Sequence, residues 1–254
     1  MLVTLEKITR AVFLVSLLAS GYLYMVKDAL PEPSFYDLDL LRDPVQTATR
    51  KSSFTTQANG QQYLIMPRYE YQLEAVIVSL HDSGEFLDTT HHRRWQDFIN
   101  LRDLCVIWGS NVESGVYREM EFSNGTWTCW VSWPNREVAS RFDGSRLSNN
   151  HLLIDDDAIK QALMQAAPGD HIRLKGMLVE YRNPGNGFHR GTSVTRNDKG
   201  NGACETIYVN EFEVIRKANQ GPRRMYTATF WVSVVSLIGV VLLFFITPFR
   251  GVRE

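Results

Sequence analysis

The feature that most constrains the fold of this 254-residue chain is a long uncharged segment close to its C-terminus. Residues 225–249 contain no Asp, Glu, Lys or Arg and are rich in Val, Leu, Ile and Phe. A helix needs about 20 apolar residues to cross a bilayer, and lipid offers the backbone no partner outside the helix. Tyr226, Trp231 and Phe249 lie near its ends, where aromatic side chains favour the membrane interface. The sequence therefore predicts a transmembrane helix at 225–249, followed by a short basic tail at 250–254.

A second apolar segment lies at the N-terminus. Residues 11–26 are uncharged and follow Lys7 and Arg10, an arrangement typical of an export signal. The uncharged run is at the short end for a spanning helix. We expect a retained transmembrane signal anchor at 1–27. The alternative is a signal peptide that is cleaved near the small residues 19–21, Ala-Ser-Gly.

The region between these two segments changes character along its length. Residues 28–61 contain several prolines and a polar stretch with little helix or strand pattern, which indicates a linker or extended arm. It would be either a solvated tether or an arm that packs on a neighbouring subunit. Residues 62–217 carry strand patterns and predict a β-rich domain. The polar residues 218–224 predict a hinge before the C-terminal apolar segment.

The organisation of the β-rich domain is clearest where a short helix leads into a strand. Asp155 and Asp156 are good N-cap residues for a helix with an apolar stripe, which Pro168 ends. From His171 onward apolar residues recur at every second position, which predicts a strand. Gly176 interrupts this strand, and a glycine there indicates a bulge or the bend of a barrel corner.

A helix that feeds a strand bent by glycine resembles the step into the fourth strand of an OB-fold barrel. Further strands are predicted at 69–78, 104–108 and 206–215, and a hairpin from 116–122 to 126–133 turns at Asn124-Gly125. The resemblance implies a fold and no activity. We therefore predict a mainly β chain with short helices, in which an OB-like small β-barrel domain lies between two transmembrane helices.

The charge balance bears on possible partners. The chain holds 27 basic and 28 acidic residues, and four basic and two acidic ones lie in the tails outside the two apolar segments. The middle of the chain is therefore slightly acidic, at −3, which makes it a poor electrostatic partner for nucleic acid. Hydrophobic content of 44% and charged content of 22% are ordinary for a folded protein.

The three cysteines, Cys105, Cys129 and Cys204, show no spacing typical of a zinc site or a redox motif. If the domain lies outside the cytoplasm, we expect one disulfide among them and one thiol left over. The spacing does not decide which two residues pair.

Three histidines are the candidates for a metal site. His91 and His92 are adjacent, and adjacent residues on a helix point about 100° apart, so both cannot easily face one ion. His81 could join them if the intervening loop folded back. The simpler interpretation is a solvated helix start, and we predict no bound metal and no cofactor.

Three tryptophans of the predicted hairpin, Trp127, Trp130 and Trp133, are candidates for an interaction surface. OB barrels often stack bases or sugars on aromatic side chains of their strands. In a strand, Trp127 and Trp133 would share one face and Trp130 would take the other. We therefore expect at least one of them to belong to the barrel core and the others to an interface patch.

No paired acid and base, nucleophile motif or phosphate-binding loop is visible in the sequence. We therefore predict a non-enzymatic interaction or scaffold subunit of a cell-envelope assembly, in contact with lipid and with other envelope proteins as a homo- or hetero-oligomer. One alternative is a membrane-anchored metal or haem carrier or thiol-redox module. Another is a cytoplasm-facing OB domain that binds single-stranded nucleic acid.

The side of the membrane is left open by the charges, because basic residues flank both apolar segments. The basic residues before the first apolar segment and the cysteine pattern favour a domain outside the cytoplasm. We expect both termini in the cytoplasm and residues 28–224 outside it, in the periplasm if the source is bacterial.

Overall fold

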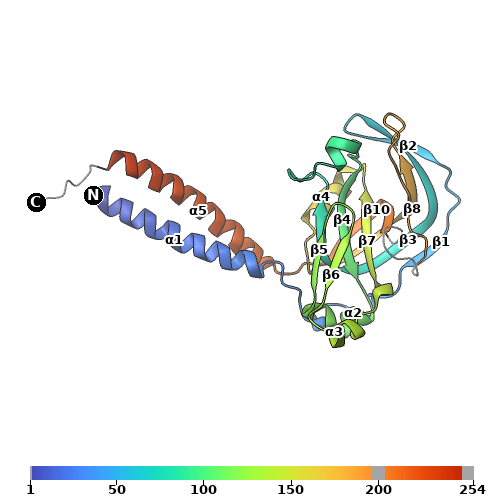
Figure 1. Cartoon of the computed structure of the whole chain (residues 1–254), viewed down its shortest axis with the longest axis horizontal. Coiled ribbons are helices and arrows are strands. Elements are labelled where there is room, and N and C mark those ends of the chain that lie inside the picture. The colour runs from blue at the N-terminus through green and yellow to red at the C-terminus, as the bar shows by residue number, and fades with distance from the viewer. Residues whose placement is uncertain (1, 196–203, 248–254) are drawn as a thin grey trace, which may run out of the picture. The chain divides into compact units, whose positions relative to one another are not determined.

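The computed structural model describes residues 2–195 and 204–247, which form two units (Figure 1). A helical unit holds the two ends of the chain, up to Ala29 and from Asn219, and a globular unit comprises Leu30–Ala218. The predicted basic tail at 250–254 lies outside the described residues, as does the end of the predicted C-terminal span at 248–249.

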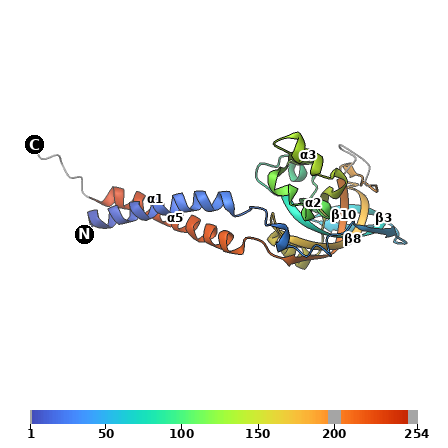
Figure 2. The same cartoon turned by 90° about the horizontal axis from the view of Figure 1, so that it is seen from below.

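In the helical unit, α1 (Leu2–Val26) and α5 (Gln220–Ile246) lie side by side, as Figures 1 and 2 show. The Ser233 hydroxyl donates a hydrogen bond of 2.9 Å to the Ser16 hydroxyl between them. Small side chains of this kind let two helix backbones approach closely. Because α5 begins at Gln220, most of the residues predicted as a hinge, 218–224, are helical.

Only one helix among the described residues, α5, is long and apolar enough to cross a membrane by length and composition. The N-terminal segment does form a helix, α1, but Glu6, Lys7 and Arg10 lie near its start. The predicted second span at 1–27 therefore stays a prediction.

The globular unit is mainly β, with a mixed eight-stranded sheet, a separate two-stranded sheet and a few short helices. The strands of the large sheet are β1 (Val45–Ala48), β2 (Phe54–Ala58), β3 (Gln61–Asp82), β4 (Asn100–Ile107), β7 (Leu147–Leu153), β8 (His171–Arg182), β9 (His189–Arg190) and β10 (Cys204–Arg216). The small sheet consists of β5 (Glu121–Asn124) and β6 (Cys129–Ser132). The short helices are η1 (Pro33–Phe35), η2 (His91–Trp95), α2 (Ser110–Glu113), η3 (Val116–Glu119), α3 (Arg136–Arg141), η4 (Gly144–Arg146) and α4 (Asp157–Gln165).

Five strands of the large sheet pair in a circle that begins and ends at β3. β3 pairs antiparallel with β4, β4 pairs antiparallel with β7, and β7 pairs parallel with β10. β10 then pairs antiparallel with β8, which in turn pairs antiparallel with β3. The main apolar core contains Leu73, Ile77, Leu104, Trp108, Leu152 and Leu174, contributed by these strands and the segment after β4.

The helix-to-strand joint predicted from the sequence is confirmed. The Asp156 carboxylate caps α4 by accepting hydrogen bonds of 2.9 Å from the backbone N–H groups of Ala158 and Ile159. β8 follows, and Gly176 lies within it where β8 passes close to β10. A Cβ atom on Gly176 would lie 2.2 Å from the carbonyl oxygen of Tyr208, so the approach of the two strands requires a glycine.

The segment expected to be a linker or arm, 28–61, differs from that expectation. It contributes β1 and β2, and both pair antiparallel with β3. The globular unit therefore begins at Leu30, not near residue 62. These two strands are rich in Thr and Gln and largely exposed, so they lack the apolar alternation that marks a half-buried strand in a sequence.

The hairpin predicted around Asn124-Gly125 is present as β5 and β6. Its first strand begins only at Glu121, because residues Val116–Glu119 form η3 instead. A disulfide between Cys105 of β4 and Cys129 of β6 joins this small sheet to the large one.

Candidate functional site

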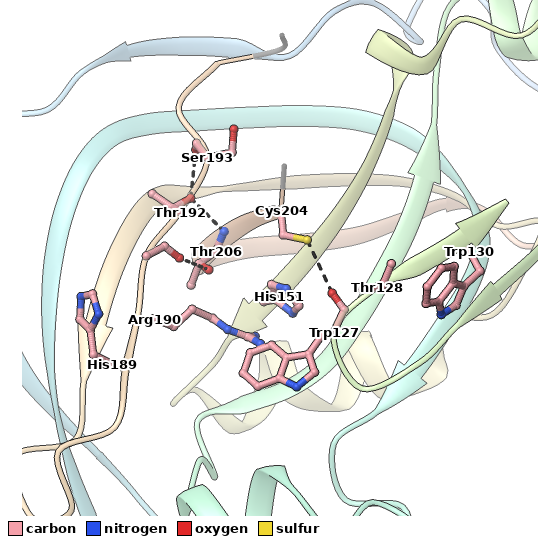
Figure 3. A pocket seen from close by; sticks show the side chains of 11 residues that line it. Trp127, Thr128, Trp130, His151, His189, Arg190, Thr192, Ser193, Cys204 and Thr206 are labelled. Carbon is pink, nitrogen blue, oxygen red and sulfur yellow. Dashed lines mark hydrogen bonds between the residues drawn. The ribbon is translucent and has the colours of Figure 1, made fainter. Parts of the chain in front are cut away.

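A cavity of about 710 Å³ opens beside the β5–β6 hairpin (Figure 3). Its wall comes from the hairpin, from β7, from β9 and the residues after it, and from the start of β10. The wall includes Trp127, Trp130, His151, Arg190, Cys204 and Thr206. It therefore offers aromatic faces together with hydroxyl, imidazole and thiol groups.

Arg190 of β9 packs against Trp127, with the guanidinium carbon 3.7 Å from the centroid of the indole. The side chain is only 8% exposed, and its Nη1 and Nη2 atoms are buried without a hydrogen-bond partner among the described residues. The charge of the guanidinium acts on the buried carboxyl group of Asp97. Burial raises the pKa of Asp97 to about 6, whereas the hydrogen bond from Tyr181 and the charge of Arg190 act in the opposite direction. Arg190 is therefore a largely buried cation in the cavity wall, close enough to Asp97 to act on its ionisation.

His151 lies beside a carboxylate. Its Nδ1 atom lies 2.7 Å from Oδ1 of Asp103, and both side chains are buried. The register places His151 opposite Asp103 on β4 and opposite Thr206 on β10. Burial lowers the pKa of His151, and Asp103 opposes this effect only in part. A neutral imidazole beside a carboxylate is suited to bind a ligand. Figure 3 shows this ring among the side chains that line the cavity.

Two of the three candidate histidines meet at a third residue. His81 Nε2 lies 2.8 Å from Oδ2 of Asp88, and His91 Nδ1 lies 2.7 Å from the same oxygen. His92 does not join them, because its ring packs on Phe98 with 4.8 Å between the ring centroids. This divergence is the one expected of adjacent residues in a helical turn.

Trp127 links this histidine pair to the cavity. Its ring centroid lies 5.6 Å from that of His91 and 6.3 Å from that of His151. Trp95 packs on Trp127 with 4.3 Å between the ring centroids. His91 and His151, each of which lies beside a carboxylate, therefore belong to one aromatic cluster around Trp127.

The three hairpin tryptophans are all exposed, so the expectation that one of them belongs to the core is wrong. Trp127 is 36% exposed, Trp130 63% and Trp133 50%. The reason is that β5 and β6 form a separate sheet, outside the closed path of the long strands. Trp127 lies in the turn between β5 and β6, not in a strand.

The cysteine pairing that the sequence left open is Cys105 with Cys129. Cys204 lies outside the disulfide, on the cavity wall, and its thiol donates to the carbonyl oxygen of Trp127 at 3.6 Å. The disulfide and this contact both hold the hairpin against the large sheet.

Sequence reasoning missed Asp88, Asp103, His151 and Arg190. Asp88 precedes His91 by three residues, and this Asp-x-x-His spacing is a local signal of a contact. His151 and Asp103 come from separate strands and have no such signal.

No protein-family model matches the chain, and no curated protein or solved structure matches it either.

Proposed function

We propose that the chain is a membrane-anchored, non-enzymatic binding protein of the cell envelope. Its globular domain contacts a partner protein through a surface that we name the tryptophan hairpin, defined by Trp127, Trp130 and Trp133. The proposal rests on three exposed tryptophans, two in the β5–β6 hairpin and Trp133 directly after it, and on the disulfide that joins this hairpin to the large sheet. Exposed aromatic clusters of this kind are typical of recognition surfaces, where tryptophan contributes strongly to binding.

The domain is proposed to be an OB-fold barrel. The circular pairing of β3, β4, β7, β10 and β8 supports this assignment, because an OB fold is a five-stranded Greek-key barrel. The position of α4 between β7 and β8 fits the resemblance noted from the sequence. OB barrels serve many functions, so the barrel supports a binding role only together with the tryptophan hairpin.

The anchor is proposed to consist of two membrane spans, α1 and α5. Apart from its charged start, α1 exposes apolar side chains, among them Leu14, Val15 and Leu18. It also packs along α5, and the hydroxyl groups of Ser16 and Ser233, in the middle of each helix, are hydrogen-bonded to each other. Exposed apolar surface of this extent on a helix is stable in lipid and costly in water.

An extracytoplasmic position of the globular domain is supported by the Cys105–Cys129 disulfide. Disulfides persist in oxidising spaces and are rare in the cytoplasm. The orientation can be tested on intact cells with a membrane-impermeant maleimide and the variant Met164→Cys/Cys204→Ser, whose free cysteine is at exposed position 164. Labelling before lysis supports the orientation, whereas labelling only after lysis contradicts it.

The binding role can be tested by photo-crosslinking in native membranes. A photoreactive phenylalanine analogue at position 130 should crosslink to a protein, either a second copy or another envelope protein, because Trp130 is the most exposed of the three indoles. The matched control carries the same analogue at Met164, an exposed residue of α4 outside the hairpin, and should give no such product. Equal products at both positions, or none at position 130, would contradict the proposal.

A nucleic-acid ligand is less well supported. The slightly acidic middle of the chain offers little electrostatic attraction to a phosphate backbone.

A second candidate function is metal binding. It is favoured because ligand atoms of His81, Asp88 and His91 lie close together.

A further inference from the structure

Three side chains that are potential metal ligands converge at one end of the sheet. His81 lies near the end of β3, Asp88 in the turn that follows, and His91 at the start of η2. One ligand atom from each residue, two imidazole nitrogens and a carboxylate oxygen, lies within 4.8 Å of the other two. We propose that these residues bind a divalent first-row transition metal ion, best matched by Zn²⁺.

The carboxylate is oriented before any ion binds. Oδ1 of Asp88 accepts hydrogen bonds of 2.8 and 2.9 Å from the backbone N–H groups of Thr90 and His91. These bonds turn Oδ2 toward both imidazoles, at 2.8 Å from His81 Nε2 and 2.7 Å from His91 Nδ1. The side chains of Asp88 and His91 are inaccessible to solvent, and that of His81 is 12% exposed. The buried side chains of Asp88 and His91 are thus fixed in position. An ion and a water ligand would reach the site from the side of His81, which is partly exposed.

The buried imidazole of His91 favours an ion over a set of hydrogen bonds alone. If no ion is bound and the histidines are neutral, His91 must carry its proton on Nδ1 to donate to Asp88. Its Nε2 lone pair is then buried, without a hydrogen-bond partner in the described part of the chain. When a metal occupies Nδ1, Nε2 carries the proton instead. The rings of Trp95 and Trp127 lie beside His91, and the face of an aromatic ring accepts an N–H weakly but cannot donate to a lone pair.

The donor set decides the class of ion. Two imidazole nitrogens and one carboxylate oxygen suit Zn²⁺ and its first-row neighbours, whereas Ca²⁺ and Mg²⁺ prefer oxygen ligands and Cu⁺ prefers sulfur. Bonds of about 2.0–2.1 Å in tetrahedral geometry would place ligand atoms about 3.3 Å apart. The nitrogen–oxygen separations of 2.7 and 2.8 Å therefore need to widen by only about 0.5 Å.

The site adjoins the tryptophan hairpin, which gives it a direct readout. His91 lies 5.5 Å from Trp95 and 5.6 Å from Trp127 between ring centroids. A paramagnetic ion such as Co²⁺ or Cu²⁺ bound at His91 should therefore quench the fluorescence of these indoles. The inference does not depend on the proposed partner protein, because it concerns an ion bound by this chain alone.

The test uses the full-length protein in detergent, stripped of metal and without a histidine tag. Titration calorimetry with Zn²⁺ should show one site, and titration with Co²⁺ should give visible absorption bands and quench tryptophan fluorescence at the same stoichiometry. His81→Ala should weaken Zn²⁺ binding by about 100-fold, because it removes one of three ligands. His91→Ala should do the same, and the partly exposed position of His81 keeps the test available if His91→Ala fails to fold.

Two control variants separate this site from other ligands. His92→Ala changes the adjacent histidine, which packs on Phe98, and Cys204→Ser changes the thiol of the cavity wall; both should bind Zn²⁺ as the unmodified chain does. Loss of binding in either control but not in His81→Ala would overturn the assignment. So would the absence of stoichiometric Zn²⁺ or Co²⁺ binding by the unmodified protein.

Discussion

The guanidinium of Arg190 lies over the indole of Trp127, with 3.7 Å between the guanidinium carbon and the ring centroid. The two residues come from β9 and from the turn of the β5–β6 hairpin, which belong to different sheets. The contact therefore helps to hold the tryptophan hairpin in place beside the cavity. Because the guanidinium is buried, it should contribute more than a contact between exposed groups.

A double-mutant cycle should measure this contact. Trp127→Ala and Arg190→Met, made singly and together, should show a coupling of about 1–2 kcal/mol in the free energy of unfolding. Chemical denaturation of the full chain in detergent, followed by near-UV circular dichroism, provides the values. The control cycle replaces Trp127→Ala with Trp130→Ala, whose indole is mostly exposed, and should give a coupling close to zero. Equal coupling in both cycles would show that the contact is not specific.

Gly176→Ala should destabilise the globular domain strongly. The new Cβ atom would lie 2.2 Å from the carbonyl oxygen of Tyr208, so β8 and β10 would have to separate. We expect a loss of about 3 kcal/mol in the free energy of unfolding, at the upper end of the usual cost of overpacking. Gly144→Ala is the control, because nothing lies within 4 Å of its added Cβ. A melting temperature that stays unchanged in Gly176→Ala would contradict the close approach of the two strands.

The disulfide should be a major source of stability. Cys105 and Cys129 are 24 residues apart, and the loop-entropy relation assigns about 3.5 kcal/mol to a cross-link of this length. The double variant Cys105→Ala/Cys129→Ala should lose about that much, measured by denaturant titration under non-reducing conditions. Cys204→Ser should retain the stability of the unmodified chain within about 1 kcal/mol, because Cys204 is outside the bridge. A labelling experiment that finds all three thiols reactive in the folded protein would exclude the pairing.

His171 should make the domain sensitive to mild acid. Burial lowers the pKa of its imidazole, an effect that nearby Glu74 and Asp37 oppose and that Arg173 and Arg216 increase. Both ring nitrogens are buried without a hydrogen-bond partner within residues 2–195 and 204–247. The unfolded chain therefore binds a proton at His171 more readily than the folded chain, so stability falls as the pH drops below the unfolded value of 6.5.

The variant that tests this prediction is His171→Leu. It should reduce the difference in melting temperature between pH 8 and pH 5, and it should be at least as stable as the unmodified chain at pH 5. His189→Leu is the matched control for replacing a histidine by leucine, because this histidine is exposed. A pH difference that persists in His171→Leu would assign the acid sensitivity to another group.

The sequence carried the information about local structure well. The uncharged segment at 225–249 predicted the apolar helix that the structure describes as α5 up to Ile246. The Asp156 cap, Gly176 within a strand and the Asn124-Gly125 turn each predicted an element that is present. These features could be predicted because they depend on backbone conformation and on periodicity within a few residues.

The strands β1 and β2 could not be predicted from the sequence, and the reason is physical. β1 and β2 are stabilised by backbone hydrogen bonds to β3, and their polar side chains are largely exposed. An exposed strand of this kind has no apolar alternation, so its sequence resembles that of a linker. Pairing with a partner distant in sequence decided its conformation.

The candidate sites show most clearly the difference between what the local sequence determines and what tertiary contacts determine. The chain itself supplied the identity of the histidines, the cysteines and the hairpin tryptophans, and the helical spacing already separated His92 from His91. Only the tertiary structure brought His81 to Asp88, His151 to Asp103 and Arg190 to Trp127. The physical reason is that these contacts form between strands and turns that meet through the pairing register of the large sheet. Local sequence determines the elements, whereas the pairing of distant strands determines which side chains share a site.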